Sequence, residues 1–188
     1  MNDPSPRGGA VNQPSTAPPA TTKGGSSTWI VIVLVALGAA VFIVGTMAVF
    51  AIYGVRKYIA NAKVAEARYS VAQLAKDATL AFERDGKLCA SASAPVPATV
   101  PGAAKYQSSA ADWQRDKAAN AGFSCLRFEM VSPQYYQYTY TSTPTSFTAT
   151  AHGDIDGDGH ASTFEIEGHV SGGTVLVSPT IKEIDPFD

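Results

Sequence analysis

The chain has 188 residues, of which 45% are hydrophobic and only 16% are charged, whereas a soluble globular domain typically carries about 25% charged residues. The net charge of −2 divides unevenly, because residues 1–28 carry +1, residues 29–88 carry +3 and residues 89–188 carry −6. The apolar excess is concentrated in residues 29–55, which excludes a single cytosolic globule. The charge distribution gives no support to a nucleic-acid partner, which requires a basic surface.

Residues 1–28 are predicted to be a disordered tail. They contain five prolines, two glycine pairs and no aliphatic side chain larger than that of Val11. Such a composition cannot bury enough apolar surface to fold.

Residues 29–55 are predicted to form a transmembrane helix. This stretch of 27 residues contains no Asp, Glu, Lys, Arg or His, and Trp29 and Tyr53 suit the two membrane interfaces. At about 1.5 Å per residue, the helix is long enough to cross a hydrocarbon core of about 30 Å. The run exceeds the apolar core of a cleavable signal peptide, so an uncleaved signal anchor is expected.

The orientation signals of this anchor conflict. Basic residues follow the span at Arg56, Lys57, Lys63 and Arg68, which favours a cytoplasmic C-terminal part, but the rule weakens before a long domain. Both cysteines lie in that domain, which favours an oxidising compartment. We therefore expect a single-pass protein with a cytoplasmic N-terminus and a periplasmic or extracellular domain.

Residues 56–87 are predicted to continue the transmembrane helix as an amphipathic helix. Apolar residues recur at spacings of three and four, and Gly86 is a C-terminal stop signal. The stripe consists of Val64, Ala67, Val71, Leu74, Ala78 and Phe82, and the opposite face is expected to carry Lys63, Glu66, Lys76, Asp77, Glu83 and Arg84. The alternative is a break at Gly54 with two separate helices.

Residues 88–188 are predicted to form a loop region followed by a small sheet. A short helix is expected to begin near Ser109, and alternating aromatic and β-branched residues indicate four or five antiparallel strands at 126–130, 135–140, 146–151, 162–167 and 174–177. A long helix with one apolar stripe, followed by such a sheet, predicts an α+β roll.

The only two cysteines, Cys89 and Cys125, bracket the loop region. We expect a disulfide between them, because neither belongs to a CxxC motif and the domain is predicted to be exported. The alternative is two unrelated buried thiols.

The segment 154–165 fits the calcium-loop pattern, in which a sharp turn at a glycine brings alternate oxygen ligands around a hard cation. The expected donors are Asp154, Asp156, Asp158, the His160 carbonyl, Ser162 and Glu165. The flanking residues are predicted to form strands, so the loop would connect the two strands of a β-hairpin. The alternative is a turn rich in Asp and Gly without any metal.

The sequence has no motif for nucleophilic catalysis or phosphate binding, so we expect no enzymatic activity. The aromatic run 134–140 suits a core strand better than a stacking surface.

The chain resembles bacterial type IV pilins and pseudopilins over about residues 56–188, and most of all those pilin-type proteins that carry a GDxDGDG hairpin. The resemblance lies in the segments 62–68, 105–109, 123–128 and 133–138 and in the run 147–159, which contains Gly-Asp-Ile-Asp-Gly-Asp-Gly. It implies a pilin-like head on the bacterial inner membrane that interacts with other pilin-like or secretion-apparatus subunits of a fimbrium. The chain departs from prepilins in having no acidic residue in its apolar segment and no usual cleavage motif. This departure favours a non-polymerising partner of such an apparatus.

Two functions therefore remain open. One is a membrane-anchored structural or assembly protein of the type IV pilus or type II secretion class. The other is an anchored calcium-dependent binding or adhesion module.

Overall fold

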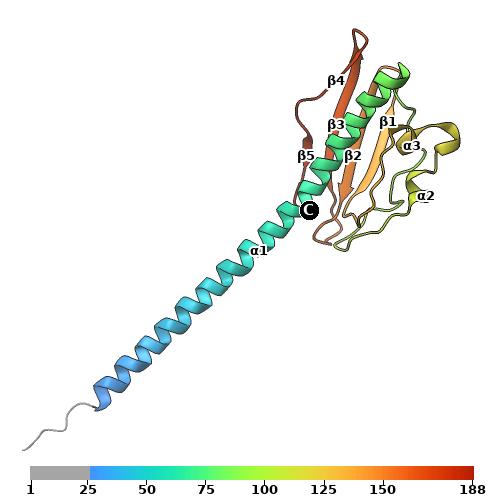
Figure 1. The fold of residues 1–188 in the computed structure, drawn as a ribbon. Coiled ribbons are helices and arrows are strands. Elements are labelled where there is room, and N and C mark those ends of the chain that lie inside the picture. Colours follow the sequence, from blue (N-terminus) through green and yellow to red (C-terminus); the bar gives the residue numbers. More distant parts are fainter. Residues whose placement is uncertain (1–25) are drawn as a thin grey trace, which may run out of the picture. The chain divides into compact units, whose positions relative to one another are not determined.

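The structure, a computed structural model, describes residues 26–188. Of the tail predicted for residues 1–28, residues 1–25 lie outside this range, whereas residues 26–28 are helical, so the prediction was wrong for these three. The described residues fall into two units, one ending at Val49 and one comprising Phe50–Asp188. The fold confirms the predicted α+β class, in which a long N-terminal helix packs on a small antiparallel sheet (Figure 1). We refer to residues 56–188 as the head.

Helix α1 comprises Ser26–Asp85 as one element of 60 residues, so the alternative break at Gly54 does not occur. The helix begins slightly before the predicted boundary, and its end confirms the stop signal. Gly86 adopts a positive φ of 69°, and its amide donates to the Phe82 carbonyl over 2.8 Å. Among the described residues, α1 is the one helix that is long and apolar enough to cross a membrane.

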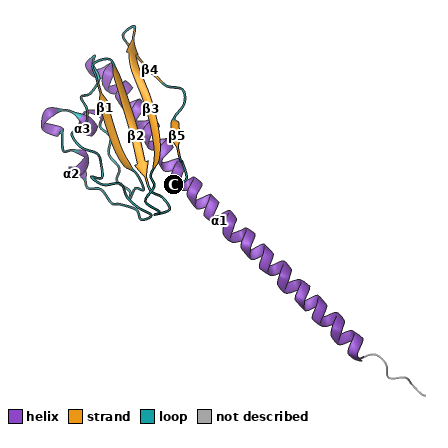
Figure 2. Ribbon diagram, turned by 180° about the vertical axis from the view of Figure 1, so that it is seen from behind, coloured by secondary structure: helices purple, strands orange, loops and turns teal. Residues whose placement is uncertain are grey.

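The sheet has five strands. They are β1 (Gln137–Ser142), β2 (Ser146–Gly153), β3 (Ser162–Ser171), β4 (Thr174–Val177) and β5 (Lys182–Ile184). The strands follow the order β1-β2-β3-β4, and β5 pairs with the beginning of β3 (Figure 2). All pairs are antiparallel, with Tyr138 opposite Ala151 and Ala151 opposite Phe164.

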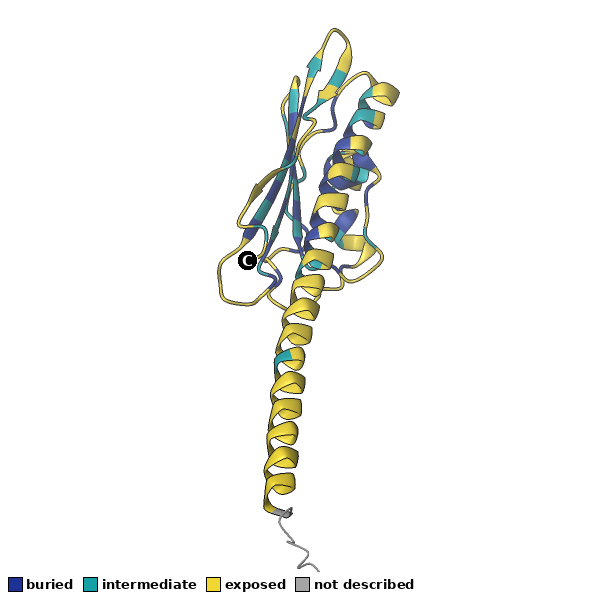
Figure 3. Ribbon diagram, turned by 90° about the vertical axis from the view of Figure 1, so that its left-hand side faces the viewer, coloured by how far each residue is buried: buried dark blue, intermediate teal, exposed yellow. Residues whose placement is uncertain are grey.

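The core lies between α1 and one face of this sheet, where the buried residues gather in Figure 3. The predicted apolar stripe is confirmed, because Val64, Ala67, Val71, Leu74 and Ala78 are completely buried and Phe82 is partly buried. Tyr136, Tyr138 and Tyr140 are also completely buried, which confirms that the aromatic run belongs to a core strand. The other face of the sheet is polar, and no described helix covers it in Figures 1 and 2.

The loop region beside β1 contains α2 (Ala110–Trp113), a 3₁₀ turn (Lys117–Ala119) and α3 (Gly122–Leu126). The predicted short helix is confirmed as α2. Ser109 caps it, because its hydroxyl accepts from the Asp112 amide while the Asp112 carboxylate accepts from the Ser109 amide.

One strand prediction was wrong, and one strand was missed. Residues 126–130 are the end of α3 and a loop, because Arg127 turns the chain with a φ of 62° and Phe128 packs edge-on against Trp113 at 5.4 Å. Strand β5 was not predicted at all.

Candidate functional site

The acidic loop, residues 154–161, joins β2 to β3. One carboxylate oxygen from each of Asp154, Asp156 and Asp158 lies within 4.8 Å of the other two. Asp154 is half-buried, whereas Asp156 and Asp158 are exposed. The structure therefore brings together the three aspartates that the sequence predicted.

Hydrogen bonds within the loop orient these carboxylates. The two oxygens of Asp154 accept from the amides of Gly157 at 2.6 Å and Gly159 at 3.1 Å. Both glycines have positive φ, at 83° and 93°, which other residues adopt only with strain. The sharp turn expected at Gly159 is thus present.

The other predicted donors have different roles. Ser162 is completely buried, and its hydroxyl donates to the Gly153 carbonyl over 2.7 Å. Glu165 alternates with the buried Phe164 along β3, and it accepts from Lys182 over 3.2 Å on the open face of the sheet. The His160 amide donates to Asp158 over 2.8 Å. Glu165 is not among the acidic side chains that gather at the three aspartates.

The donor set still suits a hard divalent cation. Ca²⁺ takes six to eight oxygen ligands, and three carboxylates are the kind of donor it prefers. Without Glu165, neutral oxygens from the main chain, from hydroxyl groups or from water would have to complete the coordination. Asp154, Asp156 and Asp158 are the residues that could hold such an ion.

The acidic loop is attached to α1. Ile155 is buried in the core, and the Lys63 ammonium donates to its carbonyl over 2.6 Å. The same ammonium lies 4.7 Å from the centre of the Tyr135 ring, and that of Lys105 lies 4.9 Å from it. Lys63 therefore links α1, the acidic loop and the segment before β1.

Glu66 lies one turn beyond Lys63 and makes a second link to the same segment. Its carboxylate accepts from the Tyr135 amide over 2.7 Å and from the Tyr138 hydroxyl over 3.4 Å. Burial raises the pKa of Glu66, and the Tyr135 amide and the charge of Lys105 offset part of that effect. Lys63 and Glu66 were expected on the solvent face of the helix, but both are half-buried at the edge of its contact with the rest of the head. Both residues stand directly beside a stripe residue in the sequence, Lys63 before Val64 and Glu66 before Ala67. This was the signal from which their position at the edge of the contact could have been predicted.

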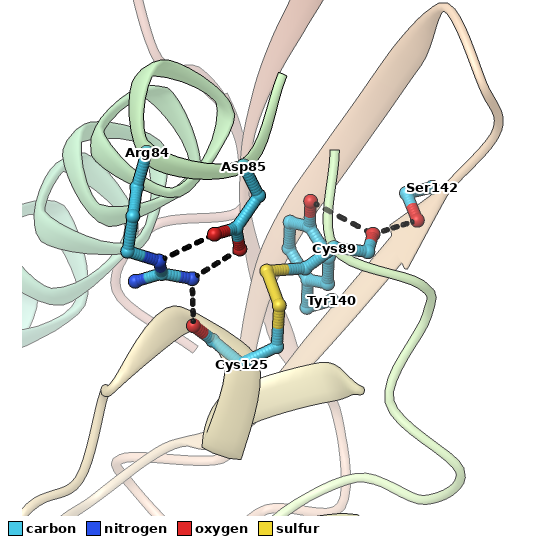
Figure 4. Close-up of a disulfide and its surroundings, with 6 residues drawn as sticks. All are labelled: Arg84, Asp85, Cys89, Cys125, Tyr140 and Ser142. Carbon is cyan, nitrogen blue, oxygen red and sulfur yellow. Dashed lines mark hydrogen bonds and ion pairs between the residues drawn. A yellow bond between two sulfur atoms is a disulfide. The ribbon is translucent and has the colours of Figure 1, made fainter. Parts of the chain in front are cut away.

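The predicted disulfide between Cys89 and Cys125 is present, with a Cα–Cα distance of 5.8 Å. Figure 4 shows the groups around it. The Ser142 hydroxyl donates to the Cys89 carbonyl over 2.5 Å, and Arg84 donates to the Cys125 carbonyl over 3.1 Å. The bridge thus joins the segment after α1 to α3, while its neighbours connect it to β1 and to the end of α1.

An open groove lies beside this bridge, between the segment after α1 and the turn that follows β1. Its titratable lining residues are Asp85 and Lys87, and the rest are mainly small side chains. Arg84 binds the Asp85 carboxylate and holds the pKa of Asp85 below its usual value. The groove thus contains no pair of groups suited to acid–base catalysis.

Comparisons of the chain with protein-family models, curated proteins and solved structures find no significant match.

Proposed function

We propose that the chain is a membrane-anchored, pilin-like structural protein that acts in a type IV pilus or type II secretion type of apparatus. In this proposal residues 29–55 anchor it in the bacterial inner membrane, and the head recognises other pilin-like or secretion-apparatus subunits. Its action is helix packing and surface recognition rather than catalysis.

The observation that carries the proposal is the composition of α1. Its first half exposes large apolar side chains such as Ile32, Leu37 and Phe42, which water does not favour and a bilayer would cover. Its second half forms the core of the head together with an antiparallel sheet. One helix that serves both purposes suits a protein that displays a folded head at a membrane surface.

The disulfide supports the proposed orientation. Structural disulfides form and persist in oxidising compartments and are rare in the cytosol. A head that contains Cys89 and Cys125 as a bridge is therefore expected outside the cytoplasm, with the N-terminus inside.

Cell fractionation combined with thiol alkylation tests this proposal. The full chain is produced in a bacterial host, its cells are lysed in the presence of an alkylating reagent, and the denatured chain is tested for free thiols with and without prior reduction. We expect the chain in the membrane fraction and its cysteines labelled only after reduction.

The matched control is a variant without residues 29–55, which should be soluble and cytoplasmic and should label without reductant. A soluble full-length chain, or one whose cysteines are free in the cell, would contradict the proposal.

A calcium-dependent binding module is the second candidate, and the convergence of the three aspartates favours it. If it is correct, Ca²⁺ added to the full chain in detergent will raise the unfolding temperature, as any ligand of the folded state does. The Asp156→Asn variant should lose that shift, because it removes one charge and leaves the hydrogen bonds of Asp154 in place. Equal unfolding temperatures with Ca²⁺ and with a chelator would exclude this candidate.

A further inference from the structure

The edge of the sheet at β4 differs from the edge at β1. Along β1, Tyr138 exchanges two backbone hydrogen bonds with Val96, at 2.7 and 3.0 Å, so a preceding segment of the chain already covers that edge. In contrast, β4 lies at the outer edge of the sheet and pairs with β3 only (Figure 2). Within residues 26–188 no other segment pairs with it. The sheet is therefore open at β4.

The register of β4 identifies its free backbone groups. Ser171 and Thr174 are the paired residues that close the two-residue turn between β3 and β4, and such a closing pair exchanges hydrogen bonds. Because hydrogen-bonded and non-hydrogen-bonded positions alternate along an antiparallel pair, Leu176 also bonds to β3, whereas Val175 and Val177 do not. The amides and carbonyls of these two valines therefore point away from β3 and are available to an added strand.

The sequence of β4 lacks the features that normally protect an open edge. Natural sheets protect such edges with charged side chains, prolines or bulges. Strand β4 consists of Thr-Val-Leu-Val, without a charge or a proline, and its Leu176 is 49% exposed. The neighbouring strand β5, in contrast, carries Lys182 and Glu183. Strand β4 is therefore the part of this edge at which another strand can be added.

A cleft lies beside β4, between this strand and the last turns of α1. Its lining residues are Thr79, Phe82, Glu83, Gly86, Gly173, Thr174 and Val175. Its volume of about 230 Å³ is below the roughly 300–1,000 Å³ of small-molecule pockets. Phe82 and Val175 pack against the core but are only partly buried. The cleft thus suits an apolar side chain of a protein partner better than a small ligand.

A strand added to β4 would fill this cleft. Residues that lie directly opposite each other on neighbouring strands direct their side chains to the same face of the sheet. Val175 and Val177 face the core beneath α1, so the partner residues opposite them face the same way. An apolar side chain opposite Val175 would contact Phe82, and the added strand would cover the exposed parts of both valines.

Glu83 gives the cleft a negative charge. It is exposed, and it is the one charged side chain among the described residues that line the cleft. None of the ion pairs between described residues includes it. Residues 89–188 add a net charge of −6. A partner segment with a basic side chain beside Glu83 is therefore attracted to this edge, and an acidic segment is repelled.

We propose that the open edge of β4 binds an extended segment of another protein as an additional strand of the sheet. The segment has apolar side chains at alternate positions and a basic side chain at the end that lies beside Glu83. A second copy of β4 does not supply that charge, because Thr-Val-Leu-Val contains no basic residue. The proposal rests on the proposed function in one respect, since it assigns the surface by which the head recognises a protein partner.

A synthetic peptide added to the full-length chain in detergent tests the proposal. The probe is fluorescein-labelled Thr-Val-Thr-Val-Thr-Lys, which can pair antiparallel with β4 so that its valines lie opposite Val177 and Val175 and its lysine lies opposite Gly173. We expect saturable binding by fluorescence anisotropy and slower amide hydrogen exchange in residues 174–177. The same peptide with N-methyl groups on both valines cannot donate to β4 and should bind at least tenfold more weakly.

Variants of the chain locate the binding site. Val177→Pro removes one outward amide of β4, a change that an edge strand tolerates, and should weaken binding at least tenfold. Glu83→Lys should weaken binding severalfold and should favour a peptide that ends in glutamate instead of lysine. The matched control is Glu129→Lys, which makes the same change in net charge at an exposed position beside α3 and should leave binding unchanged.

Other outcomes overturn the proposal in distinguishable ways. Equal binding of the N-methylated peptide would show that the backbone of β4 is not the contact. Self-association of the chain that Val177→Pro abolishes would identify a second copy as the occupant. No binding of the peptide to a chain that is found in the membrane fraction would exclude this edge and leave the proposed function intact. A soluble chain with free cysteines that still binds the peptide would contradict the proposed function alone.

Discussion

The guanidinium of Arg84 binds the carboxylate of Asp85 and, with the same terminal nitrogen, donates to the carbonyl oxygen of Cys125 over 3.1 Å (Figure 4). Arg84 is in the last turn of α1, whereas Cys125 is in α3. The end of the long helix is therefore connected to the loop region both by this hydrogen bond and by the covalent path through the disulfide.

Replacing both Cys89 and Cys125 by serine should destabilise the head by about 3–4 kcal/mol. The bridge joins residues separated by 36 positions, and closing a loop of that size removes about this much free energy from the unfolded chain on the loop-entropy model. Urea unfolding of the full chain in detergent measures the change. Reductant should destabilise the wild type and leave the double variant unchanged, and equal unfolding midpoints of the two proteins without reductant would contradict the prediction.

Replacing Glu66 by glutamine should make the head less sensitive to pH. Burial raises the pKa of Glu66 in the folded chain, so the folded state binds the proton more tightly than the unfolded state does. This contribution to stability is complete below the usual carboxyl pKa of about 4.3 and is lost as the pH rises through the folded pKa. Glutamine keeps an acceptor for the Tyr135 amide but does not ionise.

We therefore expect the stability of the Glu66→Gln variant, relative to the wild type, to rise between about pH 4 and pH 7. Urea unfolding at several pH values measures this difference. A constant difference over that range would show that Glu66 does not titrate with a raised pKa.

The core of the head could be predicted from the sequence because its signals are local. The stripe from Val64 to Ala78 and the alternation of Tyr136, Tyr138 and Tyr140 each follow from the geometry of one helix or one strand. Ser109 and Asp112 form a capping box within four residues. Such patterns do not depend on any distant part of the chain.

Strand β5 could not be predicted, because distant contacts place it. It has only three residues and all are exposed. It pairs with β3, and Glu183 receives two hydrogen bonds from Arg68 of α1, at 2.7 and 2.8 Å. The position of Glu165 outside the aspartate cluster depends in the same way on the pairing of β3 with β5, which a loop motif does not encode.

Replacing Gln134 by leucine should destabilise the head by roughly 1–3 kcal/mol, the usual cost of a buried polar group left without a partner. The Tyr136 carbonyl loses the Gln134 donor, whereas the Val96 carbonyl keeps a backbone donor. Gln134 is completely buried. Its amide nitrogen donates to the carbonyls of Val96 and Tyr136 at 3.2 and 2.9 Å, and its oxygen accepts from Ser108 at 3.0 Å. Ser108 in turn accepts from the Trp113 indole over 2.8 Å.

The matched control is Gln137→Leu. Gln137 is half-buried and makes one side-chain hydrogen bond, to the Pro97 carbonyl over 3.0 Å, so its replacement should cost clearly less. Urea unfolding of both variants, followed by Trp113 fluorescence, measures the two changes. Similar losses of stability in the two variants would show that the buried hydrogen bonds of Gln134 contribute no more to folding than the single hydrogen bond of Gln137.

Replacing Gly153 by alanine should destabilise the head by about 1–3 kcal/mol, the usual cost of overpacking a core. An added Cβ would lie 2.5 Å from the Tyr136 ring, and that ring is completely buried and packs edge-on against Phe164 at 5.6 Å. The ring therefore has no space into which it could move.

At Gly102 an added Cβ meets nothing within 4 Å, so Gly102→Ala should leave the stability unchanged or raise it by less than about 1 kcal/mol. Thermal unfolding of the two variants measures the contrast. If Gly153→Ala unfolded at the wild-type temperature, the close packing of β2 on Tyr136 would have to be wrong.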